Sequence, residues 1–126
     1  MNKYQKLAIR TAKKIDQKSD LIHAGLGLAG EAGEFVDAVK KYAIYNKPLD
    51  KANLIEELGD LLWYIALACD TLGIDMDEVA KQNIDKLLLR YPDKYTDELA
   101  SRRLDKPCVC QHIHLCELHD RCVKNG

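Results

Sequence analysis

Two pairs of carboxylates, each with a spacing of three residues, are the part of this sequence best suited to chemistry. Glu31 and Glu34 form the first pair, and Glu57 and Asp60 form the second. Three positions turn a helix by about 300°, so the two acids of each pair lie on nearly the same face, one turn apart. Like charges at this distance repel each other unless a cation lies between them. Oxygen-only ligands of this kind suit Mg²⁺ or Mn²⁺ better than zinc.

The second pair lies in the stretch 54–72, which predicts the central helix of the domain. Proline is absent there and Leu and Ala dominate, so helix is the favoured state. Apolar residues cover most of the circumference, which predicts burial on most sides. Carboxylates rarely enter such a helix unless something pairs with them, so the stretch is expected to form half of a metal site. Asp50 is the expected N-cap, and Gly73 is the expected left-handed residue at the C-terminal end.

The first pair lies in a second predicted helix over residues 21–45, for which Ser19 or Asp20 is the expected cap. If the two helices run antiparallel, all four carboxylates converge on one point. Four glycines fall inside this helix, although each costs about 1 kcal/mol relative to alanine. Small residues let another backbone approach and leave space for a ligand beside the acids. The alternative is a glycine-rich loop. The glycines are Gly25, Gly27, Gly30 and Gly33.

Two further helices complete the predicted fold. An amphipathic helix is expected over residues 3–18. Another is expected over 76–90, beginning at a capping box formed by Asp75 and Glu78. No stretch has the strict alternation of a strand, so the fold class is predicted to be all-α, a bundle of four to five helices.

The composition favours one helical domain with a short appendix. The chain has 126 residues, of which 47% are hydrophobic, enough for a core. We expect a helical domain carrying the acidic pairs over residues 1–97 and a Cys/His-rich appendix over 98–126.

The net charge of −1 gives no polyanion-binding footprint, so no nucleic-acid partner is expected. No apolar run approaches the roughly 20 residues that span a bilayer, and the N-terminus lacks a signal peptide's apolar segment, so a cytoplasmic protein without a membrane partner is expected.

The appendix contains four of the five cysteines together with three histidines. An odd, lopsided set of cysteines does not fit a secreted disulfide framework. Zn²⁺ ligation is one interpretation of this cluster, and a helical tail with reduced thiols is the other. The residues are Cys108, Cys110, His112, His114, Cys116, His119 and Cys122.

The acidic motifs match a known family. Gly-Glu-Ala-Gly-Glu at 30–34, followed by Glu-Glu-Leu-Gly-Asp at 56–60, resembles the Glu-x-x-Glu … Glu-x-x-Asp signature of MazG-like all-α nucleoside triphosphate pyrophosphohydrolases. The run Asn-Ile-Asp-Lys-Leu-Leu-Leu-Arg-Tyr-Pro at 83–92 resembles the basic Lys-x3-Arg segment of that family. The match covers about residues 20–95, and the chain beyond about residue 100 does not align.

The resemblance implies hydrolysis of nucleoside or deoxynucleoside triphosphates between the α and β phosphates, with Mg²⁺ or Mn²⁺. It also implies assembly as a dimer or a dimer of dimers, with an active site often completed by a neighbouring subunit. Motif and helical geometry together make Glu31, Glu34, Glu57 and Asp60 the candidate metal ligands. Glu56 lies about 100° round the helix from Glu57. It either completes a second metal site, orients or deprotonates the attacking water with Glu57, or is simply solvated.

Candidates for substrate binding lie further along the chain. Lys86 and Arg90 are four residues apart and share a helix face, which suits the β and γ phosphates, although an exposed basic face is the alternative. Asn83, one turn before Lys86, is a candidate for sugar or phosphate. Trp63, three residues after Asp60, either lines the nucleoside pocket or belongs to the core.

Three other functions compete with hydrolysis. A helical adaptor or binding module with solvated acidic faces would not depend on divalent metal. A di-iron carboxylate bundle would require Glu-x-x-His pairs, which neither acidic motif provides. A nucleic-acid binder that uses the Cys/His tail conflicts with the nearly neutral charge.

Overall fold

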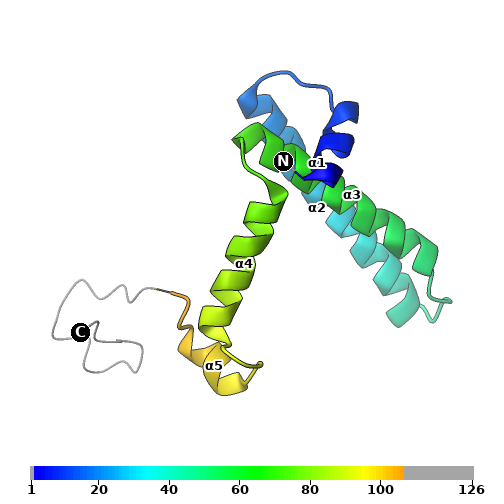
Figure 1. Ribbon diagram of the computed structural model, residues 1–126. Coiled ribbons are helices and arrows are strands. Elements are labelled where there is room, and N and C mark those ends of the chain that lie inside the picture. Colours follow the sequence, from blue (N-terminus) through cyan, green and yellow to red (C-terminus); the bar gives the residue numbers. More distant parts are fainter. Residues whose placement is uncertain (1, 107–126) are drawn as a thin grey trace. The chain divides into compact units, whose positions relative to one another are not determined.

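The computed structural model describes residues 2–106, and every regular element within that range is helical (Figure 1). The predicted all-α class is therefore confirmed. The chain divides into two compact units, Met1–Val79 and Ala80–Gly126, which are described separately below. The elements in chain order are α1 (Lys3–Ala8), the 3-10 turn η1 (Ile9–Thr11), α2 (Gln17–Ala43), α3 (Lys51–Leu72), α4 (Met76–Arg90) and α5 (Asp97–Arg102).

An antiparallel hairpin of α2 and α3 forms the body of the first unit, with α1 packed against α3 (Figure 1). Helix α2 continues through all four glycines, so the helical interpretation of this stretch is confirmed and the loop interpretation is wrong. The interface is built mainly from small side chains, which let the two backbones approach closely. The fully or nearly fully buried apolar residues of α2 and α3 are Ala24, Ala38, Ala66, Leu67 and Cys69, of which only Leu67 is large.

Helix α2 begins four residues earlier than predicted. Its N-cap is Asp16, not Ser19 or Asp20, because the Asp16 carboxylate accepts hydrogen bonds from both the backbone N–H (3.0 Å) and the hydroxyl (2.6 Å) of Ser19. Asp20 is buried instead and accepts a hydrogen bond from the backbone N–H of Ile15 at 3.1 Å.

The predicted single helix over residues 3–18 is wrong, because α1 ends at Ala8 and η1 ends at Thr11. The carbonyl of Ala8 accepts hydrogen bonds from the Thr11 hydroxyl (2.8 Å) and the Trp63 indole N–H (3.2 Å). Lys14, in the segment that follows, forms an ion pair with Asp70 of α3 at 2.6 Å. These tertiary contacts hold the chain against α3 in a non-helical path.

Helix α3 has the predicted caps but not the predicted burial. Asp50 accepts a hydrogen bond from the Asn53 backbone N–H at 3.0 Å, and Gly73 ends the helix in the left-handed region at φ 69°. Burial on most sides is wrong for the single chain, since Ile55, Leu58 and Leu62 are 60%, 49% and 45% exposed. One side of α3 packs against α2 and α1, and the apolar residues on the other side face outward.

The start of α4 is fastened to α1 by Gln5, which is fully buried. Its amide donates to the carbonyl of Ile74 and accepts from the backbone N–H of Met76, both at 3.0 Å. Asp75 accepts a hydrogen bond from the Asp77 backbone N–H at 2.9 Å, in keeping with its predicted role as a cap.

In the second unit, α4 ends at Arg90 as predicted, and α5 begins after its cap residue Thr96. Arg90 and Asp105 form a two-armed ion pair that joins the end of α4 to the segment after α5. The proposed division at residues 97 and 98 stays a prediction, because most of the appendix, including its Cys/His cluster and the Zn²⁺ interpretation, lies outside the described residues. Among the residues that the structure describes, no helix is long and apolar enough to cross a membrane.

Candidate metal centre

Three of the four predicted metal ligands meet between α2 and α3. Carboxylate oxygens of Glu31 from α2 and of Glu57 and Asp60 from α3 all lie within 4.8 Å of one another. The three-residue spacing places Glu57 and Asp60 on one face of α3, and the antiparallel hairpin brings that face against Glu31. Glu57 is buried, Glu31 is half-buried and Asp60 is exposed, so the group is open to solvent on one side.

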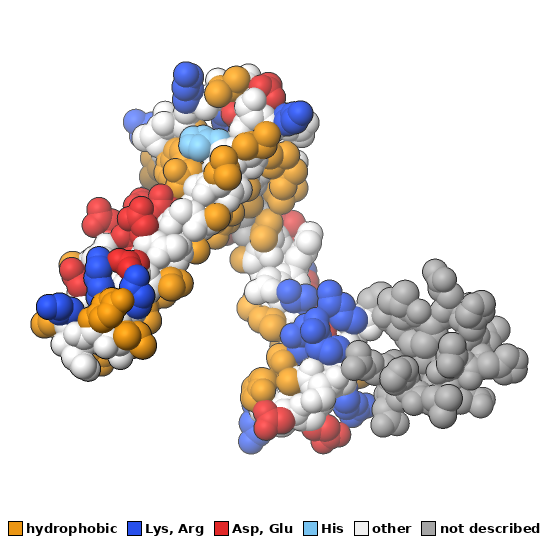
Figure 2. Space-filling view, turned by 180° about the vertical axis from the view of Figure 1, so that it is seen from behind, with side chains coloured by type: hydrophobic (Ala, Val, Ile, Leu, Met, Phe, Trp, Pro, Cys, Tyr) orange, Lys and Arg blue, Asp and Glu red, His pale blue; other side chains and the backbone are white. Residues whose placement is uncertain are grey.

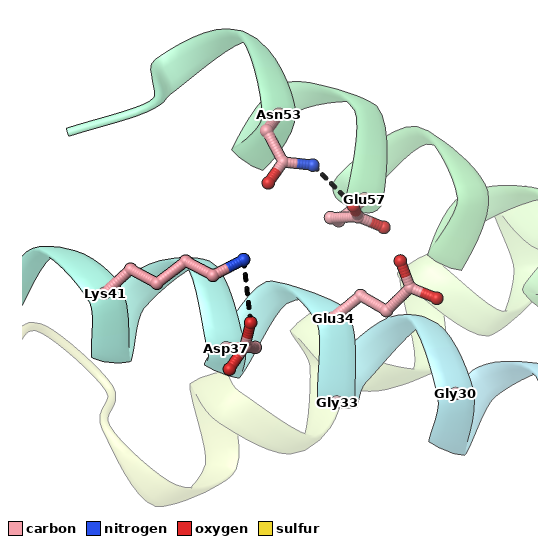
Figure 3. Close-up of a pocket in the computed structure, with 7 residues that line it drawn as sticks. All are labelled: Gly30, Gly33, Glu34, Asp37, Lys41, Asn53 and Glu57. Atoms are coloured by element: carbon pink, nitrogen blue, oxygen red, sulfur yellow. Dashed lines mark hydrogen bonds and ion pairs between the residues drawn. The ribbon is translucent and has the colours of Figure 1, made fainter. Parts of the chain in front are cut away.

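Glu34, the fourth predicted ligand, lies at the edge of this group. It comes one turn after Glu31 on α2, and its carboxylate points across the hairpin toward Glu57 (Figure 3). It is exposed and is not one of the three residues whose oxygens are mutually close. The hairpin therefore assembles three of the predicted ligands and leaves the fourth beside them.

The electrostatics of the group favour a bound cation. Partial burial raises the pKa of Glu31, and the negative charges of Glu34, Asp60 and Glu57 raise it further. Two oxygens that share one Mg²⁺ at about 2.1 Å each are at most about 4.2 Å apart, so small side-chain rotations would close the present separation. The residues present fit Mg²⁺ or Mn²⁺, both of which prefer carboxylate oxygen.

A pocket of about 420 Å³ opens beside Glu34 and Glu57 (Figure 3). Gly30 and Gly33 form part of its wall, and a Cβ at either position would meet nothing within 4 Å. The glycines therefore leave space next to the acids, as the sequence indicated. Figure 2 shows acidic side chains gathered part-way along the hairpin, between a mainly hydrophobic region and basic side chains near its tip.

Three polar residues of this pocket, Asp37, Lys41 and Asn53, were not among the sequence candidates. The Asn53 side-chain amide donates a hydrogen bond to Glu57 Oε1 at 2.6 Å, and its spacing of four residues from Glu57 could have revealed it. Lys41 pairs with Asp37 at 2.9 Å. Hydrogen bonds from Lys40 and Lys41 lower the pKa of Asp37 to about 2.

On the other side of the carboxylates lies a second, aromatic pocket of about 360 Å³, lined by Glu31, Asp60, Trp63 and Tyr64. The two rings meet edge to face with centroids 4.9 Å apart. The indole N–H of Trp63 already has two acceptors, because it donates to the Ala8 carbonyl and to the Thr11 hydroxyl. The Trp63 N–H thus joins α3 to α1 and η1, and the Trp63 ring lines a pocket; its predicted contact with a nucleoside stays a prediction.

The family model of the MazG nucleotide pyrophosphohydrolase domain matches residues 21–95, which include most of α2 and all of α3 and α4. The chain belongs to this family. The gene 37 protein of Mycobacterium phage L5 is 33% identical over 79 residues, covering 60% of this chain and 69% of that protein. The uncharacterized protein YvdC of Bacillus subtilis is 36% identical over 73 residues, covering 51% of this chain and 69% of YvdC. No solved structure matches significantly.

Four other predicted site residues of this MazG chain are not members of the group of three carboxylates. Glu56 is exposed, next to the buried Glu57. Asn83 and Lys86 are exposed on α4, in the part of the helix that belongs to the second unit. Arg90 belongs to the same unit, and its guanidinium is engaged by Asp105. The roles assigned to these residues stay predictions.

Proposed function

We propose that this chain hydrolyses a nucleoside or deoxynucleoside triphosphate between the α and β phosphates, releasing the monophosphate and pyrophosphate. Mg²⁺ is the proposed cofactor, and Mn²⁺ is expected to replace it. The observation that carries the proposal is the convergence of Glu31, Glu57 and Asp60 within a MazG nucleotide pyrophosphohydrolase domain. The family supports a hydrolase acting on nucleotides, and the carboxylate group supports its dependence on a divalent cation.

In this proposal Glu31, Glu34, Glu57 and Asp60 hold the cation. When bound, a divalent cation neutralises charge between the carboxylates and the phosphates, lowers the pKa of a water and stabilises the leaving pyrophosphate. Glu57 and its exposed neighbour Glu56 are the proposed residues that orient the attacking water and accept its proton. Their task is supported by position, since they precede Asp60 on the helix that contributes two of the three converging acids.

The phosphates need cationic partners as well. Lys86 is the proposed phosphate ligand on α4, with Asn83 one turn earlier as a hydrogen-bonding partner for sugar or phosphate. Arg90 is also proposed to bind phosphate, but a phosphate that uses it has to compete with the two hydrogen bonds from Asp105. Lys86 is therefore the first of the two to test.

For the nucleoside we propose the aromatic pocket beside the acids. The rings of Trp63 and Tyr64 provide apolar walls next to Glu31 and Asp60. A base held there would place its phosphates beside the proposed cation. The preferred base and sugar follow from the substrate panel described below.

A homodimer or homotetramer is part of the proposal. Six large apolar side chains of α2 and α3 are 45–71% accessible in the single chain, and a large exposed apolar patch is typical of a protein–protein contact surface. A second copy that covers them would restore the burial expected of α3. Light scattering on the purified protein tests this, and an active monomer would contradict it. The six exposed apolar residues that the second copy would cover are Ile22, Leu26, Val36, Ile55, Leu58 and Leu62.

A panel of ribo- and deoxynucleoside triphosphates, incubated with the purified chain and Mg²⁺, tests the reaction. We expect monophosphate and pyrophosphate in equal amounts, and no turnover when a chelator removes the metal. Release of diphosphate and inorganic phosphate would contradict the proposed bond. If no nucleotide is turned over with either metal, the chain acts as a binding module instead.

A further inference from the structure

Glu57 occupies the most constrained position of the three converging carboxylates. It is 5% exposed, whereas Glu31 is half-buried and Asp60 is exposed. A buried carboxylate is costly unless hydrogen-bond donors or a cation satisfy its oxygens. The environment of Glu57 must therefore supply a donor that does not displace the cation.

Asn53 supplies that donor. Its Nδ2 lies 2.6 Å from Glu57 Oε1, one helical turn away on the same face of α3 (Figure 3). Asn53 is itself held in place, because its backbone N–H donates to the Asp50 carboxylate at the helix cap, at 3.0 Å. A chain of contacts thus runs from the cap residue through Asn53 to Glu57.

The chemistry of the amide matters here. A hydrogen bond to one oxygen fixes the rotation of the Glu57 carboxylate about its last bond, and so fixes the direction of the second oxygen. A lysine or arginine in this place would add a positive charge that competes with a cation. An aspartate would add a further negative charge and offer no proton. A neutral amide orients Glu57 and leaves the charge of the acidic group unchanged.

We propose that Asn53 is a positioning residue that orients Glu57 toward the divalent cation. This inference rests on the metal site assigned under the proposed function. Hydrogen-bond partners of metal ligands typically contribute 10–100-fold to metal affinity. We expect Asn53→Ala to weaken Mn²⁺ binding by about this factor while the helices stay intact, because alanine is a better helix former than asparagine.

The test is a Mn²⁺ titration of the full chain without nucleotide, followed by the electron paramagnetic resonance signal of free Mn²⁺. Mn²⁺ prefers oxygen ligands, so thiolates elsewhere in the chain interfere little. Asn53→Ala should lose affinity, whereas Asn53→Gln, which keeps an amide within reach of Glu57, should retain most of it. Ala52→Ser, at the exposed neighbouring position, is the matched control and should bind like the unaltered chain.

Turnover adds a second readout. Asn53→Ala should need about 10–100-fold more Mg²⁺ for half-maximal rate, and saturating Mg²⁺ should largely restore its maximal rate. If the unaltered chain binds no Mn²⁺, the metal site itself is wrong. If it binds Mn²⁺ and the alanine variant binds equally well, the metal site stands and the role of Asn53 is refuted. Thermal unfolding of each variant separates lost affinity from lost folding.

Discussion

Arg90 and Asp105 are joined by two parallel hydrogen bonds, from Nε to Oδ1 at 2.6 Å and from Nη2 to Oδ2 at 2.5 Å. The Asp105 side chain is fully buried, and Arg103 Nε lies 3.5 Å from Asp105 Oδ1. The guanidinium of Arg90 holds the pKa of the Asp105 carboxyl well below its usual range, and Asp105 raises the pKa of Arg90 in return. The pair fastens the segment after α5 to the last residue of α4.

The first prediction concerns the pH dependence of this pair. Asp105 has a lower pKa in the folded chain than in the unfolded chain, where aspartate titrates at about 3.9. Its stabilising contribution is therefore complete above that value and is lost as the pH falls through the folded-state pKa. Asp105→Asn should melt at a lower temperature than the unaltered chain at neutral pH, and the difference should shrink toward zero in strong acid. Circular dichroism melts across the acid range measure this, with Asp93→Asn, in the exposed loop after α4, as the control. A difference that does not change with pH would contradict the assignment.

The second prediction concerns the metal ligands. Asp60→Asn and Glu34→Gln each remove one negative charge while keeping the size of the side chain. We expect each to reduce Mg²⁺-dependent turnover by more than about a hundredfold, beyond the loss typical of a residue that only supports a ligand. The far-ultraviolet circular dichroism should stay unchanged.

Mg²⁺ should also raise the melting temperature of the unaltered chain, since a ligand that binds only the folded state stabilises it. This gain in melting temperature should be smaller in both variants. Full activity in both would remove these residues from the mechanism.

The third prediction uses two glycines of α2 that differ in their surroundings. A Cβ at Gly27 would overlap the ring of Tyr64, whereas one at Gly25 would meet nothing within 4 Å. Gly27→Ala should destabilise the chain by about 1–3 kcal/mol, the usual cost of overpacking, and should displace Tyr64 from its pocket. Gly25→Ala should instead stabilise it by up to about 1 kcal/mol through helix propensity. Chemical denaturation of the two variants measures both effects. Equal shifts in the two would show that Gly27 has no packing role.

The fourth prediction uses Trp63, the single tryptophan of the chain. Its ring lines the aromatic pocket beside Glu31 and Asp60, so a nucleotide bound there should change its fluorescence. Titration with a non-hydrolysable triphosphate analogue and Mg²⁺ should give a saturable change. Lys86→Ala should weaken the apparent affinity without abolishing the fluorescence response. An unchanged spectrum, under conditions in which calorimetry detects binding, would place the base elsewhere.

Much of the site could be predicted because it depends on local rules. The spacing of Glu57 and Asp60 fixes their common face, and Asp50 and Gly73 mark the ends of α3 through their own backbone and side-chain chemistry. The path after Ala8 could not be predicted, because the Trp63 indole and the Asp70 carboxylate, both more than 50 residues away, determine it. Helical propensity alone favours continuing α1, and these distant contacts prevail over it.

The burial of α3 failed as a prediction for a related reason. A helix with apolar residues on most sides needs neighbours on most sides, and the pattern does not say whether they belong to the same chain. The predicted helix is present, but Leu58 and Leu62 face outward in the single chain. The prediction that neighbouring helices of the same chain cover them is therefore wrong. The role of Asn53 was not predicted, because this neutral side chain lies outside the acidic motif, four residues before Glu57.

The hydrogen bonds of the Trp63 indole N–H limit how far the N-terminus of this protein can be truncated. The family match begins at residue 21, yet both acceptors of that N–H, the Ala8 carbonyl and the Thr11 hydroxyl, come before it. A fragment cut at the edge of the match would keep all four carboxylates and still lose the anchor of one wall of the aromatic pocket. The smallest piece worth expressing starts at Asn2, whose side chain caps the helix that carries Ala8.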